Sequence, residues 1–176
     1  RRIDKSADIE NNIRDRFIWD LERNNTITKG LIDNDILLLD FERQHFVNQT
    51  EKRRTGIMFF ISGFDKFIVE CKCLHQQPSK NQSYIDEGLK RFVDLKYAEK
   101  NKYAGMIGFV VSGDISEIFS ATQDCVSSFY SSNHSLSQGK IGFDWNYSFL
   151  SSHIRINNED ILIYHLLFPF SSSQIN

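Results

Sequence analysis

Proline, cysteine and long apolar runs are all scarce in this sequence. The 176 residues include two prolines and three cysteines, and 40% of them are hydrophobic. This composition is typical of a folded globular chain. No apolar run approaches the length that crosses a bilayer, and no signal-peptide pattern opens the chain. We therefore expect a cytoplasmic protein without membrane contact. Because the sequence starts at Arg1 rather than Met, we also expect a leading segment to be missing.

The three cysteines, Cys71, Cys73 and Cys125, are an odd set that lacks the spacing of a zinc finger. They lie in apolar stretches, which favours reduced core residues in a cytoplasmic protein. A metal or redox pair at Cys71-x-Cys73 stays open as an alternative.

A strong charge of either sign is also lacking. Lys and Arg number 21 and Asp and Glu number 23, so the formal net charge is -2. This balance argues against a surface that is basic all over, and a nucleic-acid ligand would need a local positive field. The length fits one domain over residues 1–176, with its core at about 7–130. No internal repeat is present.

The first element is predicted to be an amphipathic helix over residues 7–23. Its buried stripe is formed by apolar residues four apart, with Ile18 on the flank; the stripe comprises Ile9, Ile13, Phe17 and Leu21. Glu10 lies on the edge of this stripe. It is either a half-exposed charge favoured by the helix dipole or a carboxylate directed at a site.

Three strands are predicted next, over residues 41–47, 56–62 and 66–74. The segment 24–40 between the helix and these strands gives no clear pattern. Lys52, Arg53 and Arg54 are expected to lie in a solvated loop. A turn at 62–64 would join the second and third strands as an antiparallel hairpin.

The rest of the chain predicts two more helices and three more strands. Ser79-x-x-Gln82 resembles a capping box before a helix that runs to about Lys96, and Gly88 on this helix permits close packing. A buried strand over 105–111 follows, and then a helix capped by Asp114 that ends near Tyr130. After a serine-rich loop over 131–139, strands over 147–156 and 161–168 form a C-terminal hairpin.

This order predicts an α/β or α+β domain with a mixed sheet and helices on both faces. The helix between the third strand and the buried strand would form a right-handed crossover, which places both strands in one sheet.

The strand that ends in Ile-Val-Glu-Cys-Lys carries the most informative pair of residues, Glu70 and Lys72. Side chains alternate along a strand, so these two project from the same face. Burying charge at the end of an apolar strand requires a partner, a metal or water. The pair is therefore either an ion pair near the surface or part of a site.

The leading helix with its glutamate, the hairpin that ends in Glu70-x-Lys72, and the following helix and buried strand together resemble the PD-(D/E)xK nuclease superfamily, with its restriction-endonuclease-like fold. The resemblance covers residues of about 7–130, and the C-terminal hairpin would be an addition.

The resemblance implies a metal-dependent DNA endonuclease that uses Mg²⁺ or Mn²⁺. Carboxylates hold Mg²⁺ because this ion prefers oxygen ligands, and the metal activates a water for phosphodiester hydrolysis. Glu70 matches the second acidic position of the motif, and Lys72 matches its lysine, which orients water or stabilises developing negative charge. Glu10 matches an acidic metal ligand that many members carry on the first helix.

Gly56 departs from the family pattern, because members carry an Asp there, commonly the principal metal ligand. With a three-residue turn at 62–64, Gly56 would lie across from Glu70 on the same face. Three explanations stay open. The domain is naturally degenerate, or the Asp was replaced to inactivate the protein, or the ligand has moved to a position such as Glu42 or Glu51.

Further polar residues are candidates for substrate binding. Gln82, Tyr84 and Arg91 on the helix after the hairpin resemble positions of extra contacts to the site or phosphate, although a solvated helix face explains them equally well. His153 and Arg155 share one face of a C-terminal strand and could touch a nucleic-acid backbone, or simply form an exposed face. His165 is predicted to be a structural histidine with satisfied hydrogen bonds.

Three functional hypotheses follow. The first is a DNA-cleaving module of a restriction, repair or antiphage defence system, inactive in this form if Gly56 has removed an essential ligand. The second is a non-catalytic module of the same fold for nucleic-acid binding or assembly, and the third is a structural domain in which Glu70 and Lys72 merely pair. DNA is the expected partner, and a homodimer or a partner subunit stays open.

Overall fold

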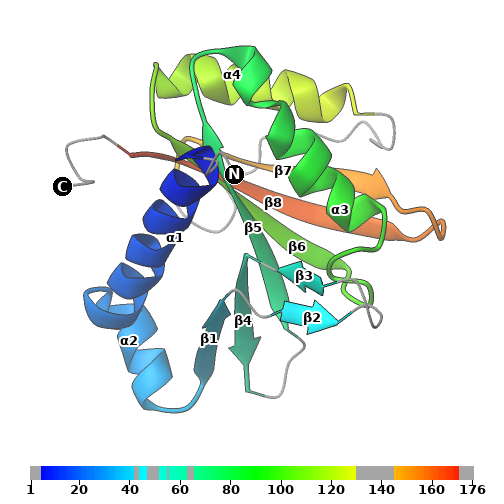
Figure 1. Ribbon diagram of the computed structural model, residues 1–176. Helices are drawn as coiled ribbons and strands as arrows, with labels where there is room; N and C mark the ends of the chain where they lie inside the picture. Colours follow the sequence, from blue (N-terminus) through cyan, green and yellow to red (C-terminus); the bar gives the residue numbers. More distant parts are fainter. Residues whose placement is uncertain are drawn as a thin grey trace. The chain divides into compact units, whose positions relative to one another are not determined.

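The computed structural model describes residues 5–41, 44–46, 52–54, 56–62, 66–129 and 145–170. The chain divides into two compact units, residues 1–66 and 67–176. Together they are of mixed α/β composition (Figure 1). Among the described helices, none combines the length and apolar character needed to cross a membrane.

The first unit begins with helix α1 (Lys5–Arg23), close to the predicted helix. Its buried side is turned relative to the predicted stripe, because Ile13 and Ile18 are buried whereas Ile9 is 41% exposed. Phe17 and Leu21 are half-buried, and so is Glu10. The i, i+4 pattern found the helix correctly but placed its buried face one residue off.

A second helix and an early strand follow α1 in the segment 24–40, for which no element was predicted. Helix α2 (Thr26–Asp33) begins after Asn25, whose side chain accepts a hydrogen bond from the Thr28 amide at 2.9 Å. Strand β1 (Leu37–Phe41) then pairs antiparallel with β4 (Ile57–Ile61), with Leu39 opposite Phe59. The predicted strand over 41–47 is therefore wrong in its bounds, because the partner of β4 starts four residues earlier.

A small antiparallel pair, β2 (Gln44–Phe46) with β3 (Lys52–Arg54), completes the described elements of the first unit. Lys52, Arg53 and Arg54 thus form a strand, which corrects the predicted solvated loop. The predicted turn at 62–64 lies largely outside the described residues, as do Glu42 and Glu51.

The second unit is built on a mixed sheet of four strands in the order β5-β6-β8-β7. Strand β5 (Phe67–Leu74) is parallel to β6 (Tyr103–Val110), and β6 is parallel to β8 (Asp160–Pro169). Strand β7 (Ser148–Ile154) joins β8 as an antiparallel hairpin. The placement of β5 and β6 in one sheet and the C-terminal hairpin were both predicted, and the structure adds that β5 and β6 pair directly. The serine-rich loop lies outside the described residues.

The connection from β5 to β6 is helical but irregular. Ser79 lies inside a short 3-10 helix, η1 (Pro78–Lys80), and the next helix begins after Ser83 without a side-chain cap, so the predicted capping box at Ser79-x-x-Gln82 is wrong. The Asn81 side chain instead bridges the backbone N–H and C=O of His75 at 2.8 Å each. The π-helix η2 (Tyr84–Leu89) then continues directly into α3 (Lys90–Val93). The helix therefore ends at Val93 rather than near Lys96.

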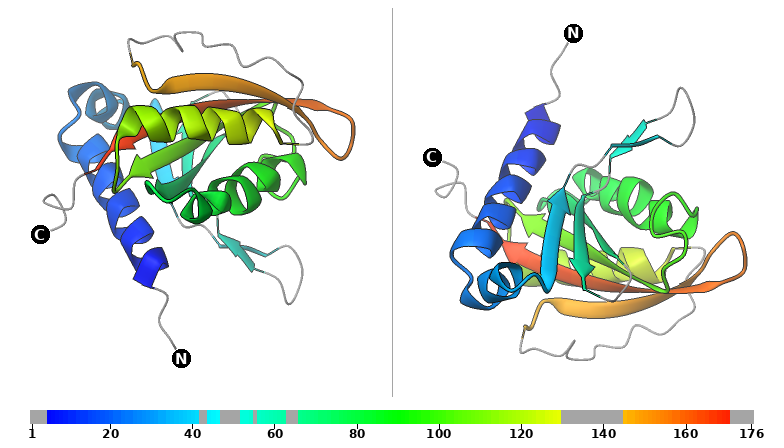
Figure 2. Two further views of the ribbon diagram at one scale, coloured as in Figure 1. Left: turned by 90° about the horizontal axis from the view of Figure 1, so that it is seen from above. Right: turned by 90° about the horizontal axis from the view of Figure 1, so that it is seen from below.

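Helix α4 (Ile115–Ser127) follows β6 and has the predicted cap, because the Asp114 side chain accepts from the amides of Ser116 and Glu117. The helices η2 and α4 cover the same face of the sheet, on the same side of β7 in Figure 2. Tyr84 of η2 lies against His165, and Phe119 of α4 lies against Phe149, which pairs with His165 across β7 and β8.

The core lies mainly on this face and within β6, where every residue from Ala104 to Val110 is buried. The helical segment between β5 and β6 contributes Ile85, Leu89, Phe92 and Val93 to this core, and all four are buried. Cys71 is buried and Cys73 is half-buried, but Cys125 is exposed, which corrects its prediction as a core residue. None of the three forms a disulfide in the described part of the chain.

Candidate functional site

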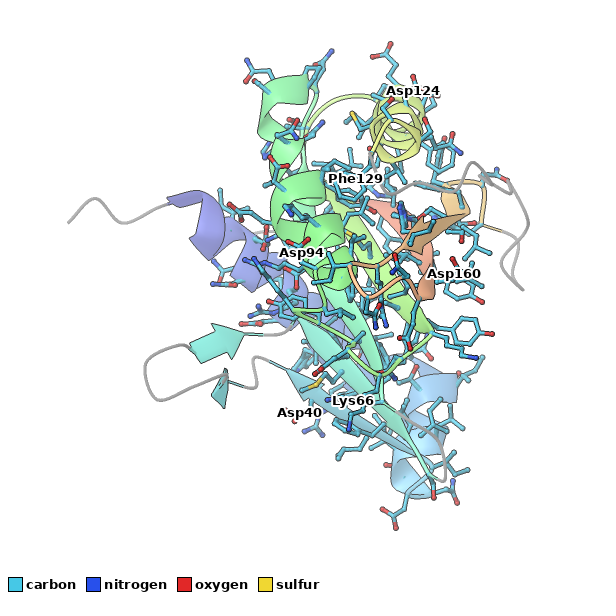
Figure 3. The ribbon with its side chains drawn as sticks, turned by 90° about the vertical axis from the view of Figure 1, so that its right-hand side faces the viewer. Asp40, Lys66, Asp94, Asp124, Phe129 and Asp160 are labelled. Atoms are coloured by element: carbon cyan, nitrogen blue, oxygen red, sulfur yellow. The ribbon has the colours of Figure 1, made fainter. Side chains whose placement is uncertain are left out.

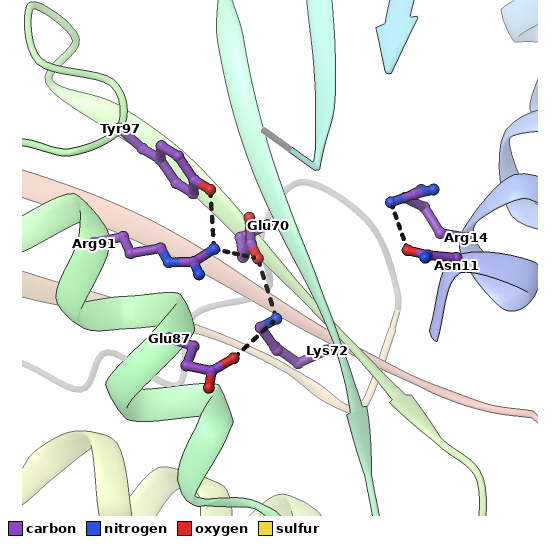
Figure 4. Close-up of polar contacts among 7 residues, drawn as sticks. All are labelled: Asn11, Arg14, Glu70, Lys72, Glu87, Arg91 and Tyr97. Atoms are coloured by element: carbon purple, nitrogen blue, oxygen red, sulfur yellow. Dashed lines mark hydrogen bonds and ion pairs between the residues drawn. The ribbon is translucent and has the colours of Figure 1, made fainter. Parts of the chain in front are cut away.

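Glu70 and Lys72 lie on the helix-covered face of β5 and are both buried, with 5% and 6% exposure. Residues paired across neighbouring strands project from the same face of a sheet. Glu70 is paired with Met106 of β6, and Met106 is paired with His165 of β8, so all three lie on the face that the helices cover. The Lys72 ammonium nitrogen, Nζ, lies 3.3 Å from Oε1 of Glu70. The two side chains are thus a buried pair rather than an ion pair at the surface (Figure 4).

Two further charged residues reach this pair from the helical segment above it. Glu87 on η2 places Oε2 3.9 Å from Lys72 Nζ, and Arg91 on α3 places NH1 3.5 Å from Glu70 Oε1. Figure 4 shows the four side chains converging between β5 and the helix. The result is a cluster of two carboxylates and two cations, which we call the Glu70 cluster.

Gly88 allows the helix to approach the strand this closely. A Cβ added at Gly88 would collide with the terminal methyl group of Met106 and would lie 3.7 Å from Cγ of Lys72. The predicted role of Gly88 in close packing is therefore confirmed. The π-helical turn that contains Gly88 also belongs to a type often found at functional sites.

Tyr97, in the segment after α3, is a further neighbour of the cluster. Its hydroxyl lies 2.9 Å from Arg91 NH1, and the Arg91 guanidinium carbon lies 5.4 Å from the centre of its ring. Burial, together with the nearby charge of Glu70, raises the pKa of the Tyr97 phenol to about 12. The phenol thus keeps its proton throughout the ordinary pH range.

A second polar network crosses the core of the same face. The Ser151 hydroxyl lies 2.7 Å from Nε2 of His153 and 2.8 Å from Nε2 of His165, and the Tyr84 hydroxyl lies 2.8 Å from Nδ1 of His165. All four side chains are at most 1% exposed. The predicted structural role of His165 is confirmed, because both ring nitrogens have partners.

The tautomer of His153 follows from its surroundings. Nδ1 of His153 is buried without a hydrogen-bond partner, and a bare ring nitrogen is less costly there than an unsatisfied N–H. The proton therefore lies on Nε2, which donates to Ser151. Burial lowers the pKa of His153 to about 4 and holds the pKa of His165 well below its usual range.

Three predicted substrate-binding residues point into the core instead. Tyr84 is 1% exposed and contacts His165, so it does not share an open helix edge with Arg91. His153 is fully buried, and Arg155 is 3% exposed and donates to the carbonyl oxygens of Ala98 and Glu99 at 2.8 and 3.2 Å. The alternative of an exposed strand face is therefore wrong. Gln82 is exposed.

The remaining predicted site residues, Glu10 and Gly56, belong to the first unit. Glu10 is half-buried, and Gly56 is buried directly before β4. The structure thus brings together Glu70, Lys72 and Arg91 of the predicted set. It adds Glu87 and Tyr97, which were not predicted from the sequence. The spacing of Glu87 and Arg91, four apart beyond a strand that carries Glu70-x-Lys72, was the available signal.

Figure 3 shows how side chains fill the second unit, with Asp94 directly after α3 and Asp160 at the start of β8. Within the described residues, no group of three or more His, Cys, Asp or Glu side chains could hold a metal ion. Comparison with protein-family models, curated proteins and solved structures produced no match.

Proposed function

We propose that this chain is a metal-dependent nuclease-type domain that hydrolyses phosphodiester bonds of DNA. The fold would be the restriction-endonuclease-like fold of the PD-(D/E)xK superfamily, and the domain would be the cutting module of a restriction, repair or antiphage defence system. The observation that carries this proposal is the buried pair of Glu70 and Lys72 on one strand, with Nζ and Oε1 3.3 Å apart.

The Glu70 cluster offers the oxygen ligands that Mg²⁺ or Mn²⁺ prefers, but it offers them from two carboxylates only. Mg²⁺ usually takes one or two carboxylates and completes its shell with water and substrate phosphate oxygens. Glu70 and Glu87 would supply two carboxylates, whereas Gly56 has no side chain to offer. When bound, the metal would neutralise the phosphate and lower the pKa of a water molecule.

The residues of the chain would carry the other parts of the reaction. Glu70 fixes the Lys72 ammonium at the site, and burial strengthens the field of that ammonium because water is largely excluded. Lys72 would then orient the attacking water and stabilise the negative charge that develops on the phosphate. Arg91 is a second cation in the described part of the chain, and it contacts the same oxygen of Glu70.

The direct test is cleavage of plasmid DNA with Mg²⁺ or Mn²⁺ by the protein as given and by Gly56→Asp, each with and without Lys72→Ala. Gly56→Asp should cleave faster than the parent, and both forms should lose activity with Lys72→Ala or with chelator. Lys90→Ala is the matched control, since Lys90 forms an ion pair with Asp94 and is not one of the four residues of the cluster. Absence of cleavage by every folded form would overturn the proposal.

One observation favours a second candidate, a non-catalytic nucleic-acid-binding or assembly module of the same fold. Glu70 is already contacted by two cations, Lys72 and Arg91, so its charge is balanced without a metal. In this case the protein would bind DNA in the presence of chelator but would not bind Mg²⁺ or Mn²⁺ tightly. A calorimetric titration with each metal separates the two candidates.

A further inference from the structure

Arg91 is anchored through one nitrogen only. NH1 lies 2.9 Å from the Tyr97 hydroxyl and 3.5 Å from Glu70 Oε1, so the phenol is the close partner and the carboxylate is the distant one. The ring of Tyr97 also lies under the guanidinium, 5.4 Å from its carbon. Tyr97 therefore contacts the Arg91 guanidinium both through its hydroxyl and through its ring, and so holds the side chain in position.

This anchoring leaves most donors of Arg91 unused. A guanidinium has five N–H donors, and the two on NH1 serve Tyr97 and Glu70. Nε and NH2 make no hydrogen bond to any residue in the described part of the chain. The side chain is 34% exposed, so this edge is open to solvent. Two parallel N–H groups in a fixed plane match the oxygens of a phosphate.

We propose that Arg91, positioned by Tyr97, binds a backbone phosphate of nucleic acid through its Nε and NH2 edge. The Glu70 cluster contains equal numbers of carboxylates and cations, so the attraction comes from directed donors rather than from a broad positive field. This agrees with the formal net charge of -2. The inference depends on the proposed function only in taking nucleic acid as the source of the phosphate.

Tyr97 is a positioning residue in this arrangement. Without its hydroxyl, NH1 would keep Glu70 as its remaining partner, and the guanidinium could turn toward that carboxylate. Loss of the hydroxyl alone should therefore weaken phosphate binding while the positive charge stays in place. Loss of the charge and loss of the orientation can therefore be distinguished by two measurements, the affinity and its dependence on salt.

The experiment measures binding of a fluorescent DNA duplex to the full chain, in chelator, over a series of salt concentrations. Chelator removes hydrolysis, so failure of the nuclease proposal would not affect this test. The variants are Arg91→Ala, Arg91→Lys and Tyr97→Phe. The matched controls are Arg23→Ala, on an exposed residue in the last turn of α1, and Tyr103→Phe, on a tyrosine that is 49% exposed.

We expect Arg91→Ala to weaken binding by about 10-fold or more, because a charge-assisted pair is lost. It should also reduce the slope of log K against log salt by about 1, because one phosphate contact is lost. Arg91→Lys and Tyr97→Phe should keep the slope but weaken binding, Tyr97→Phe by about 5-fold, the worth of one hydrogen bond. The two controls should match the parent.

An unchanged affinity and slope in folded Arg91→Ala would overturn the proposal, as would an effect no larger than that of Arg23→Ala. If Arg91→Ala does not fold, Arg91→Lys decides, since it keeps the charge and most of the aliphatic stem; parental affinity in that variant would contradict the oriented contact. A calorimetric titration with inorganic phosphate tests whether the phosphate group that Arg91 binds belongs to nucleic acid. Arg91-dependent binding of phosphate without binding of the duplex would overturn nucleic acid as the ligand.

Discussion

Lys72 Nζ lies 3.3 Å from Oε1 of Glu70 inside the second unit, and each side chain is at least 93% buried. Two oppositely charged side chains on one face of one strand thus neutralise each other in a place from which water is largely excluded. Either charge alone would be costly at this place, because an unpaired buried ion loses its hydration without compensation. The pair therefore has to be kept or removed as a unit.

We predict a large coupling between these two residues in folding stability. Removing one partner of a buried pair costs about 3–5 kcal/mol, and here the cost should be near the lower end because Arg91 and Glu87 also contact the pair. The double variant Glu70→Gln/Lys72→Met should cost clearly less than the sum of the single variants. Urea unfolding of all four forms measures this coupling.

Lys90→Met supplies the control for the pair, because Lys90 forms a partly exposed i, i+4 ion pair with Asp94 and should lose less than about 1 kcal/mol. Strict additivity of the two single variants would contradict the coupling. The purely structural interpretation predicts in addition that the double variant keeps all DNA binding and cleavage.

We predict that acid destabilises the second unit through His153 and His165. Their folded pKa values lie below the usual 6.5, to about 4 for His153, so the unfolded chain binds more protons between these values. Their stabilising contribution is fully present above about pH 6.5 and is lost as the pH falls toward 4. Each histidine should contribute a slope of up to about 1.4 kcal/mol per pH unit.

Urea unfolding at a series of pH values measures this slope. In His153→Phe the absolute stability will differ, but the slope between about pH 6.5 and 4 should fall by the contribution of one proton. An identical slope in parent and variant would show that His153 is not the titrating group.

We predict unequal effects of alanine at two glycines. In Gly108→Ala the new Cβ would lie 2.5 Å from Cδ1 of Leu74 and 3.1 Å from Cγ of Leu167, so two branched side chains on neighbouring strands must move. This should cost about 1–3 kcal/mol. In Gly88→Ala the collision is with the flexible end of Met106, and a better helix propensity offsets part of the cost, so the loss should stay below about 1 kcal/mol.

Thermal or urea unfolding of the two alanine variants checks this order. A greater loss for Gly88→Ala than for Gly108→Ala would contradict the close packing assigned to the leucine pair. DNA binding in chelator should be lower in Gly88→Ala than in Gly108→Ala if Met106 displaces the stem of Lys72.

Helices and strands were predicted best where the local sequence carries one clear signal, such as a regular spacing of apolar residues or a capping residue. The alternating face of Glu70 and Lys72, the continuous apolar run of β6 and the cap at Asp114 each depend on local physics, and each prediction was confirmed. Helix α2 was missed because it has only eight residues, too few for its apolar side chains to establish a clear helical period, and none of them is buried.

The candidate site was predictable only where its residues share one strand. Glu87 and Tyr97 reach Glu70 and Lys72 through a π-helical turn and an irregular segment, and periodicity does not predict either. His153 and Arg155 were placed on an outer face because polar residues on a strand usually face water. Their burial depends on partners far along the chain, Ser151 with His165 in one case and the carbonyls of Ala98 and Glu99 in the other.

Arg155 connects the C-terminal hairpin to the segment that carries Tyr97, and its loss should loosen that segment. Leu95 and Ala98 both have a positive φ, 58° and 51°, which is costly for residues other than glycine. Arg155 donates to the carbonyl oxygens of Ala98 and Glu99, and the Ile156 amide donates to the Val93 carbonyl at 3.2 Å. These bonds hold the strained segment in place.

We therefore predict that Arg155→Met lowers the free energy of unfolding by about 1–3 kcal/mol, because the Ala98 carbonyl loses its donor in a buried hydrogen bond and the Glu99 carbonyl loses its donor in a partly buried one. The exposed control Arg23→Met should stay within about 0.5 kcal/mol of the parent. Amide hydrogen exchange should accelerate most in the segment from Leu95 to Glu99, and DNA binding in chelator should weaken in the same direction as in Tyr97→Phe. Unchanged exchange in that segment, with the fold intact, would show that the hairpin does not support Tyr97.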